Sequence, residues 1–167
     1  MFAISRRPLR RFAGTGAAAF LLSAAVVGLA PAPASAHSLS DIVRSSEGCG
    51  WSSGSYTNQD SRSAVNRNGS RYGTVYLLWS GTYGENCVVT RKESWHGTLT
   101  WTNAELHYRS SGSGAEGVVQ DEGQYGHYAA ITQKTSGHCV RFLGSISSGG
   151  HGGPLATGSR DEWGNCG

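Results

Sequence analysis

The sequence lacks the patterns that define several large classes of protein. No segment keeps an apolar period of 3.6 residues over three turns, which excludes a helical bundle. Beyond residue 36, no run approaches the ~20 apolar residues that a membrane-spanning helix needs. The cysteines form no C-x-x-C pair and the histidines no H-x-H pair, so the spacing of a structural zinc site is missing. What is present is 25 glycines with many serines and threonines, a composition that favours short strands and turns.

The N-terminal segment has the three parts of a secretory signal peptide. A basic stretch with arginines at positions 6, 7, 10 and 11 precedes the apolar segment Ala17–Ala30, and the small-residue cleavage site Ala34–Ala36 follows. We therefore predict that residues 1–36 are removed and that the exported chain begins at His37. Both Sec and twin-arginine export remain open, because the second arginine pair blurs the twin-arginine pattern.

Removal of this segment changes the charge of the protein. The segment carries four arginines and none of the 11 Asp and Glu residues, so the net charge of +3 falls to slightly below zero. Binding to nucleic acid and to anionic lipid then loses its usual electrostatic driving force. We therefore expect no nucleic-acid partner, and no membrane association once the signal peptide has been removed.

All four cysteines lie in the predicted exported part, where an oxidising environment favours disulfides. Three pairings are open, and we favour Cys49–Cys87 together with Cys139–Cys166. In the chain-entropy model, loops of these lengths would each contribute about 3.5–4 kcal/mol to stability.

The chain from Gly73 onward is dominated by segments that resemble β-strands. Gly73–Ser80 and Cys87–Lys92 are rich in β-branched and aromatic residues and flank a turn sequence, which predicts a hairpin. Gly97–Ser110 alternates apolar and polar residues, with a bulge or bend expected at Thr102–Ala104. Gly117–Tyr125 is expected to be a short apolar pair followed by a polar turn.

These segments predict a single all-β domain, a small disulfide-bonded β-sandwich or barrel of antiparallel hairpins. Within it, residues 37–72 are expected to be an N-terminal loop-rich segment, and residues 73–167 are expected to form the β core.

Four stretches carry a resemblance to a known family. GTVYLLWSGTYGENCVVT, QDEGQYGHYA, HCVRFLGSI and the C-terminal NCG resemble the secreted spore-associated protein A family of spore-forming filamentous bacteria. The resemblance covers roughly Gly73 to Gly167, and Cys49 fits an early cysteine of the family. It implies export, association with the spore or the culture fluid, and a disulfide-bonded β domain. It implies no active-site residues.

The candidate catalytic patterns are weak. Ser147–Gly158 (SSGGHGGPLATG) is similar to the nucleophile loop of chymotrypsin-like proteases, but His151 stands where the serine would be, which favours a plain glycine-rich loop. Asp121 and Glu122, near His127, could act as an acid–base pair, but adjacent strand residues point to opposite faces. We interpret this pair as a solvated turn, and Asp161-Glu162 likewise. We therefore expect that the protein is not an enzyme.

The histidines are the remaining candidates for metal binding. Their spacing shows no ligand motif, so neither a metal site nor a cofactor is predicted, although the fold can bring distant histidines together. One hypothesis stays open: as the first residue of the exported chain, His37 could bind copper through its amine and its imidazole. The six are His37, His96, His107, His127, His138 and His151.

Aromatic residues are the best candidates for ligand binding. Trp79 and Trp101 lie in apolar strand segments and are expected in the core. Trp95 and Trp163 lie among polar residues, so they are the possible ligand-binding aromatics.

The sequence thus predicts a secreted, non-catalytic protein of the extracellular space or of the spore or cell surface. Its expected partner is the cell wall or the spore surface. Two alternatives are a carbohydrate- or cell-wall-binding module that uses exposed aromatics, and a small secreted hydrolase or inhibitor. The identity of the ligand and the oligomeric state stay open.

Overall fold

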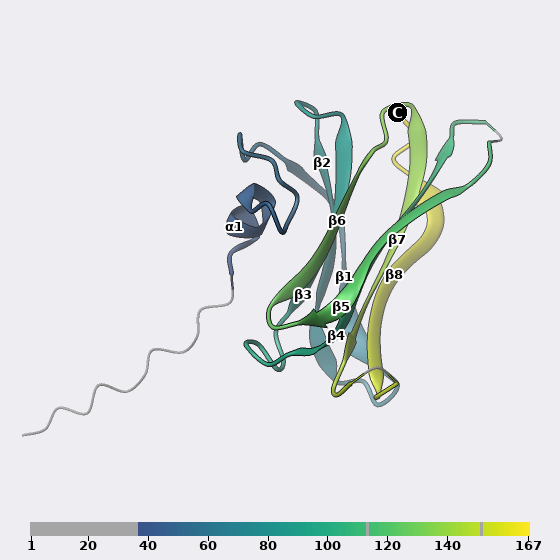
Figure 1. Ribbon diagram of the computed structural model, residues 1–167. Coiled ribbons are helices and arrows are strands. Elements are labelled where there is room, and N and C mark those ends of the chain that lie inside the picture. The colour runs from purple at the N-terminus through teal and green to yellow at the C-terminus, as the bar shows by residue number, and fades with distance from the viewer. Residues whose placement is uncertain (1–36, 113, 151) are drawn as a thin grey trace, which may run out of the picture. The chain divides into compact units, whose positions relative to one another are not determined.

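The computed structural model describes residues 37–112, 114–150 and 152–167, all within one compact unit. The predicted signal peptide and His151 lie outside the described residues. No described helix is long and apolar enough to cross a membrane. The elements are α1 (Leu39–Arg44), β1 (Thr57–Asn66), β2 (Arg71–Ser80), β3 (Glu85–Lys92), β4 (Thr100–Ser110), β5 (Gly117–Tyr125), β6 (Tyr128–Lys134), β7 (His138–Ser147) and β8 (Leu155–Gly164) (Figure 1).

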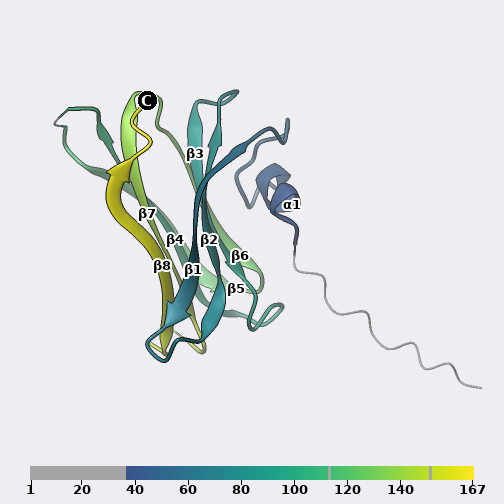
Figure 2. The same ribbon diagram turned by 180° about the vertical axis from the view of Figure 1, so that it is seen from behind.

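The eight strands form one antiparallel sheet that curls into a nearly closed barrel, which confirms the all-β prediction. The order of hydrogen-bonded neighbours is β5-β4-β7-β8-β1-β2-β3-β6. Figure 2, the view from behind, shows β8 and β1 side by side, and β7 and β2 are their next neighbours in the sheet. The two strands at the ends of this order, β5 and β6, follow each other in sequence and lie against each other. We call their line of contact the seam.

The barrel interior is filled by side chains that alternate along the strands. In β4, for example, Thr102, Ala104 and Leu106 are buried, while Glu105 and His107 between and beyond them are partly exposed. This period of two is the expected pattern of a strand with one face in a core. The largest fully buried apolar side chains of the interior are Phe142, Leu77, Leu106, Ile146, Val75 and Val88.

One part of the barrel is buried on both faces. Strands β2, β3 and β6 send a second set of apolar side chains outward, where α1 covers them with Ile42 and Val43. This explains the unbroken apolar runs in β2 and β3, since both neighbouring positions meet a core. Ser38 begins the helix by accepting a hydrogen bond from the backbone N–H of Asp41. The outer core also contains Leu78, Cys87, Val89, Ala130, Cys49 and Trp51.

Two disulfides hold the chain ends onto the sheet. Cys49–Cys87 joins the segment after α1 to β3, and Cys139–Cys166 joins the start of β7 to the residues after β8. These are the two pairs that the sequence analysis favoured. Each bridge attaches to a strand a segment that is not itself part of the strand pairing.

Several local predictions differ from the structure. Trp79 and Trp101, expected in the core, are only partly buried. The segment 37–72, expected to be loop-rich, contains α1, the ten-residue strand β1 and the beginning of β2. Gly117–Tyr125, expected to end in a turn, is strand throughout, because it pairs with β4 along its whole length. The bulge expected at Thr102–Ala104 is absent, since the described register of β4 with both neighbours is continuous there.

Candidate functional site

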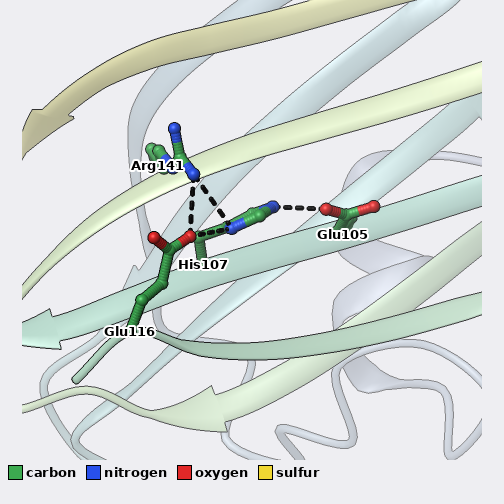
Figure 3. A network of polar contacts seen from close by, with 4 residues as sticks. All are labelled: Glu105, His107, Glu116 and Arg141. Carbon is green, nitrogen blue, oxygen red and sulfur yellow. Dashed lines mark hydrogen bonds and ion pairs between the residues drawn. The ribbon is translucent and has the colours of Figure 1, made fainter.

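A network of charged side chains lies on the outer surface of the half of the barrel that α1 leaves uncovered. His107 of β4 stands between two carboxylates: its Nε2 contacts Glu105 and its Nδ1 contacts Glu116 (Figure 3). Arg141 of β7 donates to Glu116 at 2.7 Å and lies 3.4 Å from His107 Nδ1. The strand pairing brings these residues together. His107 of β4 is the register partner of Arg141 of β7, and Glu105, two residues from His107, lies on the same face of β4.

The members of this network contact one another, although the buried Nε of Arg141 has no hydrogen-bond partner. His107 uses both of its ring nitrogens in these contacts, one with each carboxylate. The hydrogen bond with His107, followed by that with Arg141, lowers the pKa of Glu116 below its ordinary value. Neither ring nitrogen is therefore free to contact a substrate. The arrangement suits recognition of a polar ligand better than acid–base catalysis.

Trp163 extends the network onto β8. The guanidinium carbons of Arg109 and Arg141 lie 4.4 Å and 5.0 Å from the centre of its ring, and the side chain is half-buried. Arg141 thus links the tryptophan to the carboxylates. Trp163, predicted as a possible ligand-binding aromatic, therefore lies on a charged surface and not in isolation.

Trp95, the other predicted aromatic, lies elsewhere. Its backbone is in the left-handed region (φ 53°), in the connection between β3 and β4. Its ring packs edge-on against Tyr72 with 4.3 Å between centroids and closes over the interior core. Trp95 lies before the first residue of β4. Trp163 instead contacts Arg109, near the last residue of β4, so the structure does not bring the two tryptophans together.

We call the outer surface of β5, β4, β7 and β8 the polar face. Alternation places exposed polar residues of β5 outward, and the register sets them opposite outward residues of β4. Gln120 is opposite Glu105, Glu122 is opposite Asn103, and Gln124 is opposite Trp101. The polar face thus comprises Glu105, His107, Arg109, Glu116, Gln120, Glu122, Gln124, Arg141 and Trp163.

A second group, the histidine cluster, consists of His37, His96 and His127. His127 Nδ1 lies 3.0 Å from His96 Nε2, and the His37 ring lies 4.6 Å from that of His127 between centroids. Burial lowers the pKa of both His96 and His127, and the positive charges nearby add to the effect. His107 and His138 lie elsewhere in the sheet. Sequence spacing could not reveal this cluster, because its members are separated by 59 and 31 positions.

Within the described residues, no three His, Cys, Asp or Glu side chains have the geometry to hold a metal ion as they stand. In the cluster, the third ring stands apart from the pair, with 6.2 Å between the centroids of His37 and His96. His96 Nδ1 is buried and has no hydrogen-bond partner.

Beneath the histidine cluster lies Lys92, which is fully buried without a carboxylate partner. Its Nζ donates to the carbonyl oxygens of Thr98 and Tyr125 and to the hydroxyl of Thr100, at 2.7, 2.9 and 2.7 Å. Burial lowers the pKa of Lys92 from 10.5 to about 8. The ammonium therefore ties the β3–β4 connection and the end of β5 to the barrel, at a cost in solvation.

The shifted pKa of Lys92 predicts a stability that rises in alkaline solution. Between pH 8 and 10.5, the unfolded chain binds a proton that the folded protein does not, so the cost of burial is relieved as pH rises through 8. From pH 7.5 to 9.5, the unfolding free energy of the parent should gain about 2 kcal/mol relative to Lys92→Met. Denaturant unfolding of both proteins across this range checks it, and parallel pH profiles would count against it.

The seam carries its own polar contacts. Asp121 of β5 accepts hydrogen bonds from the Tyr125 hydroxyl and, at 3.1 Å, from the backbone N–H of Ala130 in β6. The hydrogen bond with Asp121, together with burial, raises the pKa of Tyr125 to about 12. A hollow of about 460 Å³ opens here, lined by Glu47, Asp121, Tyr125, Gly126, His127 and Tyr128.

The other predicted candidates can now be placed. Asp121 and Glu122 do point to opposite faces, but within a strand and not in the solvated turn that was expected. Asp161-Glu162, also interpreted as a solvated turn, is an exposed part of β8. Of the loop Ser147–Gly158, residues 148–150 and 152–154 connect β7 to β8, and His151 lies outside the described residues.

Comparison with protein-family models, curated proteins and solved structures finds no match to this chain. The resemblance to the spore-associated protein A family therefore stays a prediction. The two disulfides fit an extracellular protein.

Proposed function

We propose that the protein is a secreted, non-catalytic protein of the cell or spore surface that binds wall polysaccharide through the polar face. The observation that carries the proposal is the composition of that face. Amide, carboxylate, imidazole and guanidinium groups lie in register on neighbouring strands, and a half-buried tryptophan lies at one end.

These groups match the chemistry of a sugar chain. Sugar hydroxyls both donate and accept, and the polar face offers acceptors in Glu122 and donors in Arg109, with the glutamines offering both. The exposed part of the half-buried Trp163 ring adds an apolar surface for the C–H side of a sugar ring. An extended, regularly spaced ligand suits an extended strand surface, since every second residue faces outward.

The proposal is consistent with the rest of the molecule. The predicted exported chain is close to neutral, so polar contacts and not bulk charge would have to provide affinity. Strand surfaces are also rigid, which limits the conformational entropy lost on binding. The disulfides fit the location where wall polysaccharide is met.

Retention on insoluble polysaccharide tests the proposal. We expect the exported protein to be retained on purified cell wall or chitin, and we expect Trp163→Ala to weaken retention about tenfold, equivalent to about 1.4 kcal/mol. The double variant Gln120→Ala/Glu122→Ala should weaken it by a similar factor with little change in unfolding temperature, because both side chains are exposed.

Leu99→Ala is the matched control, since Leu99 is 67% exposed in the connection before β4 and is not part of the polar face. It should be retained like the parent. Equal retention of all variants would place binding elsewhere, and no retention of the parent on any wall fraction would overturn the proposal.

A further inference from the structure

The histidine cluster combines three distant parts of the chain at one place. His37 precedes α1, His96 lies in the β3–β4 connection, and His127 forms part of the two-residue turn between β5 and β6. The charged groups that act on these rings include Lys92, Arg91 and Asp41, none of which accepts or donates a hydrogen bond to them in the structure.

The spacing of the paired rings fits metal coordination. Two nitrogens bound to one ion at about 2.0–2.1 Å lie about 3 Å apart when they occupy neighbouring positions. The distance from His127 Nδ1 to His96 Nε2 is 3.0 Å.

Export would supply one further nitrogen donor, the α-amine of His37. If cleavage follows Ala36, as the sequence predicts, His37 gains a free α-amine. An amine and an imidazole on one residue form a chelate, and the exposed His37 side chain can turn toward the neighbouring rings.

We propose that the exported chain binds one Cu(II) ion through the amine and imidazole of His37 together with the imidazoles of His127 and His96. Four nitrogen donors and no carboxylate suit the tetragonal preference of Cu(II), which also binds nitrogen ligands more tightly than Ni(II) or Zn(II). Lys92 and Arg91 oppose a cation electrostatically, so the site depends on its ligand set and not on negative charge. This site is separate from the polar face and does not depend on the proposed polysaccharide binding.

Titration with Cu(II) tests the site on protein exported from cells, with its first residue determined by mass. Residues 37–167 contain every described element and both disulfides, so this form keeps the whole fold. We expect a one-to-one complex whose electron paramagnetic resonance spectrum shows coupling to several nitrogens. His127→Ala, His96→Ala and His37→Ala should each weaken binding by about 100-fold or more, a loss that even outer partners of metal ligands can reach.

Two controls separate this site from adventitious binding. The full chain of residues 1–167 has no free amine at His37 and should bind as weakly as His37→Ala, whereas His138→Ala should bind like the parent. Circular dichroism establishes that each variant is folded. An exported chain that begins at another residue, equal affinity with and without the free amine, or unchanged affinity in both His127→Ala and His96→Ala would each overturn the proposal.

Discussion

Replacement of Trp51 by alanine is expected to destabilise the protein by about 3–5 kcal/mol, the usual cost of removing a buried tryptophan. Trp51 is only 1% exposed and is the largest side chain of the outer core. It packs with Ile42, Val43 and the apolar residues of β2, β3 and β6, and its Nε1 donates to Glu85 at 2.9 Å. Alanine would leave a cavity under α1 and an unmatched carboxylate, so the helix would lose much of its contact with the barrel.

Denaturant unfolding of three variants separates these effects. Trp51→Phe keeps most of the apolar volume and loses the hydrogen bond, so it should cost about 1–2 kcal/mol. Leu99→Ala removes an exposed side chain and should change stability by less than about 0.5 kcal/mol. A Trp51→Ala protein as stable as Leu99→Ala would contradict the assignment of Trp51 to a core.

Removal of the Cys49–Cys87 disulfide by a double change to alanine is expected to cost about 4 kcal/mol. The bridge closes a loop with a sequence separation of 38, and the chain-entropy model gives the energy from this length. Both cysteines are buried in the outer core, so the bridge also fixes the segment that carries α1 and Trp51 onto β3. For a domain with a typical unfolding free energy of about 5–15 kcal/mol, the loss is a large fraction.

The second bridge is a matched control. Cys139–Cys166 has a separation of 27, for which the same model gives about 3.5 kcal/mol, but Cys166 is exposed one residue before the end of the sequence. If loop entropy alone matters, the two double variants should be almost equally destabilised. A clearly larger loss at Cys49–Cys87 would show the added contribution of the outer core. Unfolding midpoints equal to that of the parent would refute both estimates.

The hairpin β2–β3 could be predicted from the sequence because its residues are buried on both faces. Apolar, β-branched and aromatic residues therefore fill consecutive positions, and the turn between them is rich in glycine. Strand β5 could not be predicted, because only one of its faces meets the core and that face includes Asp121 and two glycines. Its pairing with β4 determines its extended conformation, and this pairing cannot be predicted from the composition of the segment alone.

The candidate sites divide in the same way. Glu105 and His107 are two residues apart, so a shared face was detectable once the segment was assigned as a strand. Their partners Glu116 and Arg141 come from a loop and from another strand. The histidine cluster depends wholly on the order of strands in the barrel, which brings the β3–β4 connection next to the β5–β6 turn. The resemblance in sequence motifs indicated neither the network around His107 nor the histidine cluster.

The seam has a consequence for how the protein behaves when it is concentrated. Strands at the ends of an open sheet present rows of unpaired backbone groups, on which a second molecule can add a strand and start an aggregate. Here the two end strands lie against each other, and the Asp121 carboxylate occupies the N–H of Ala130. The molecule therefore covers part of its own sheet edges. Such a protein can accumulate at high density on a surface without polymerising through its sheet.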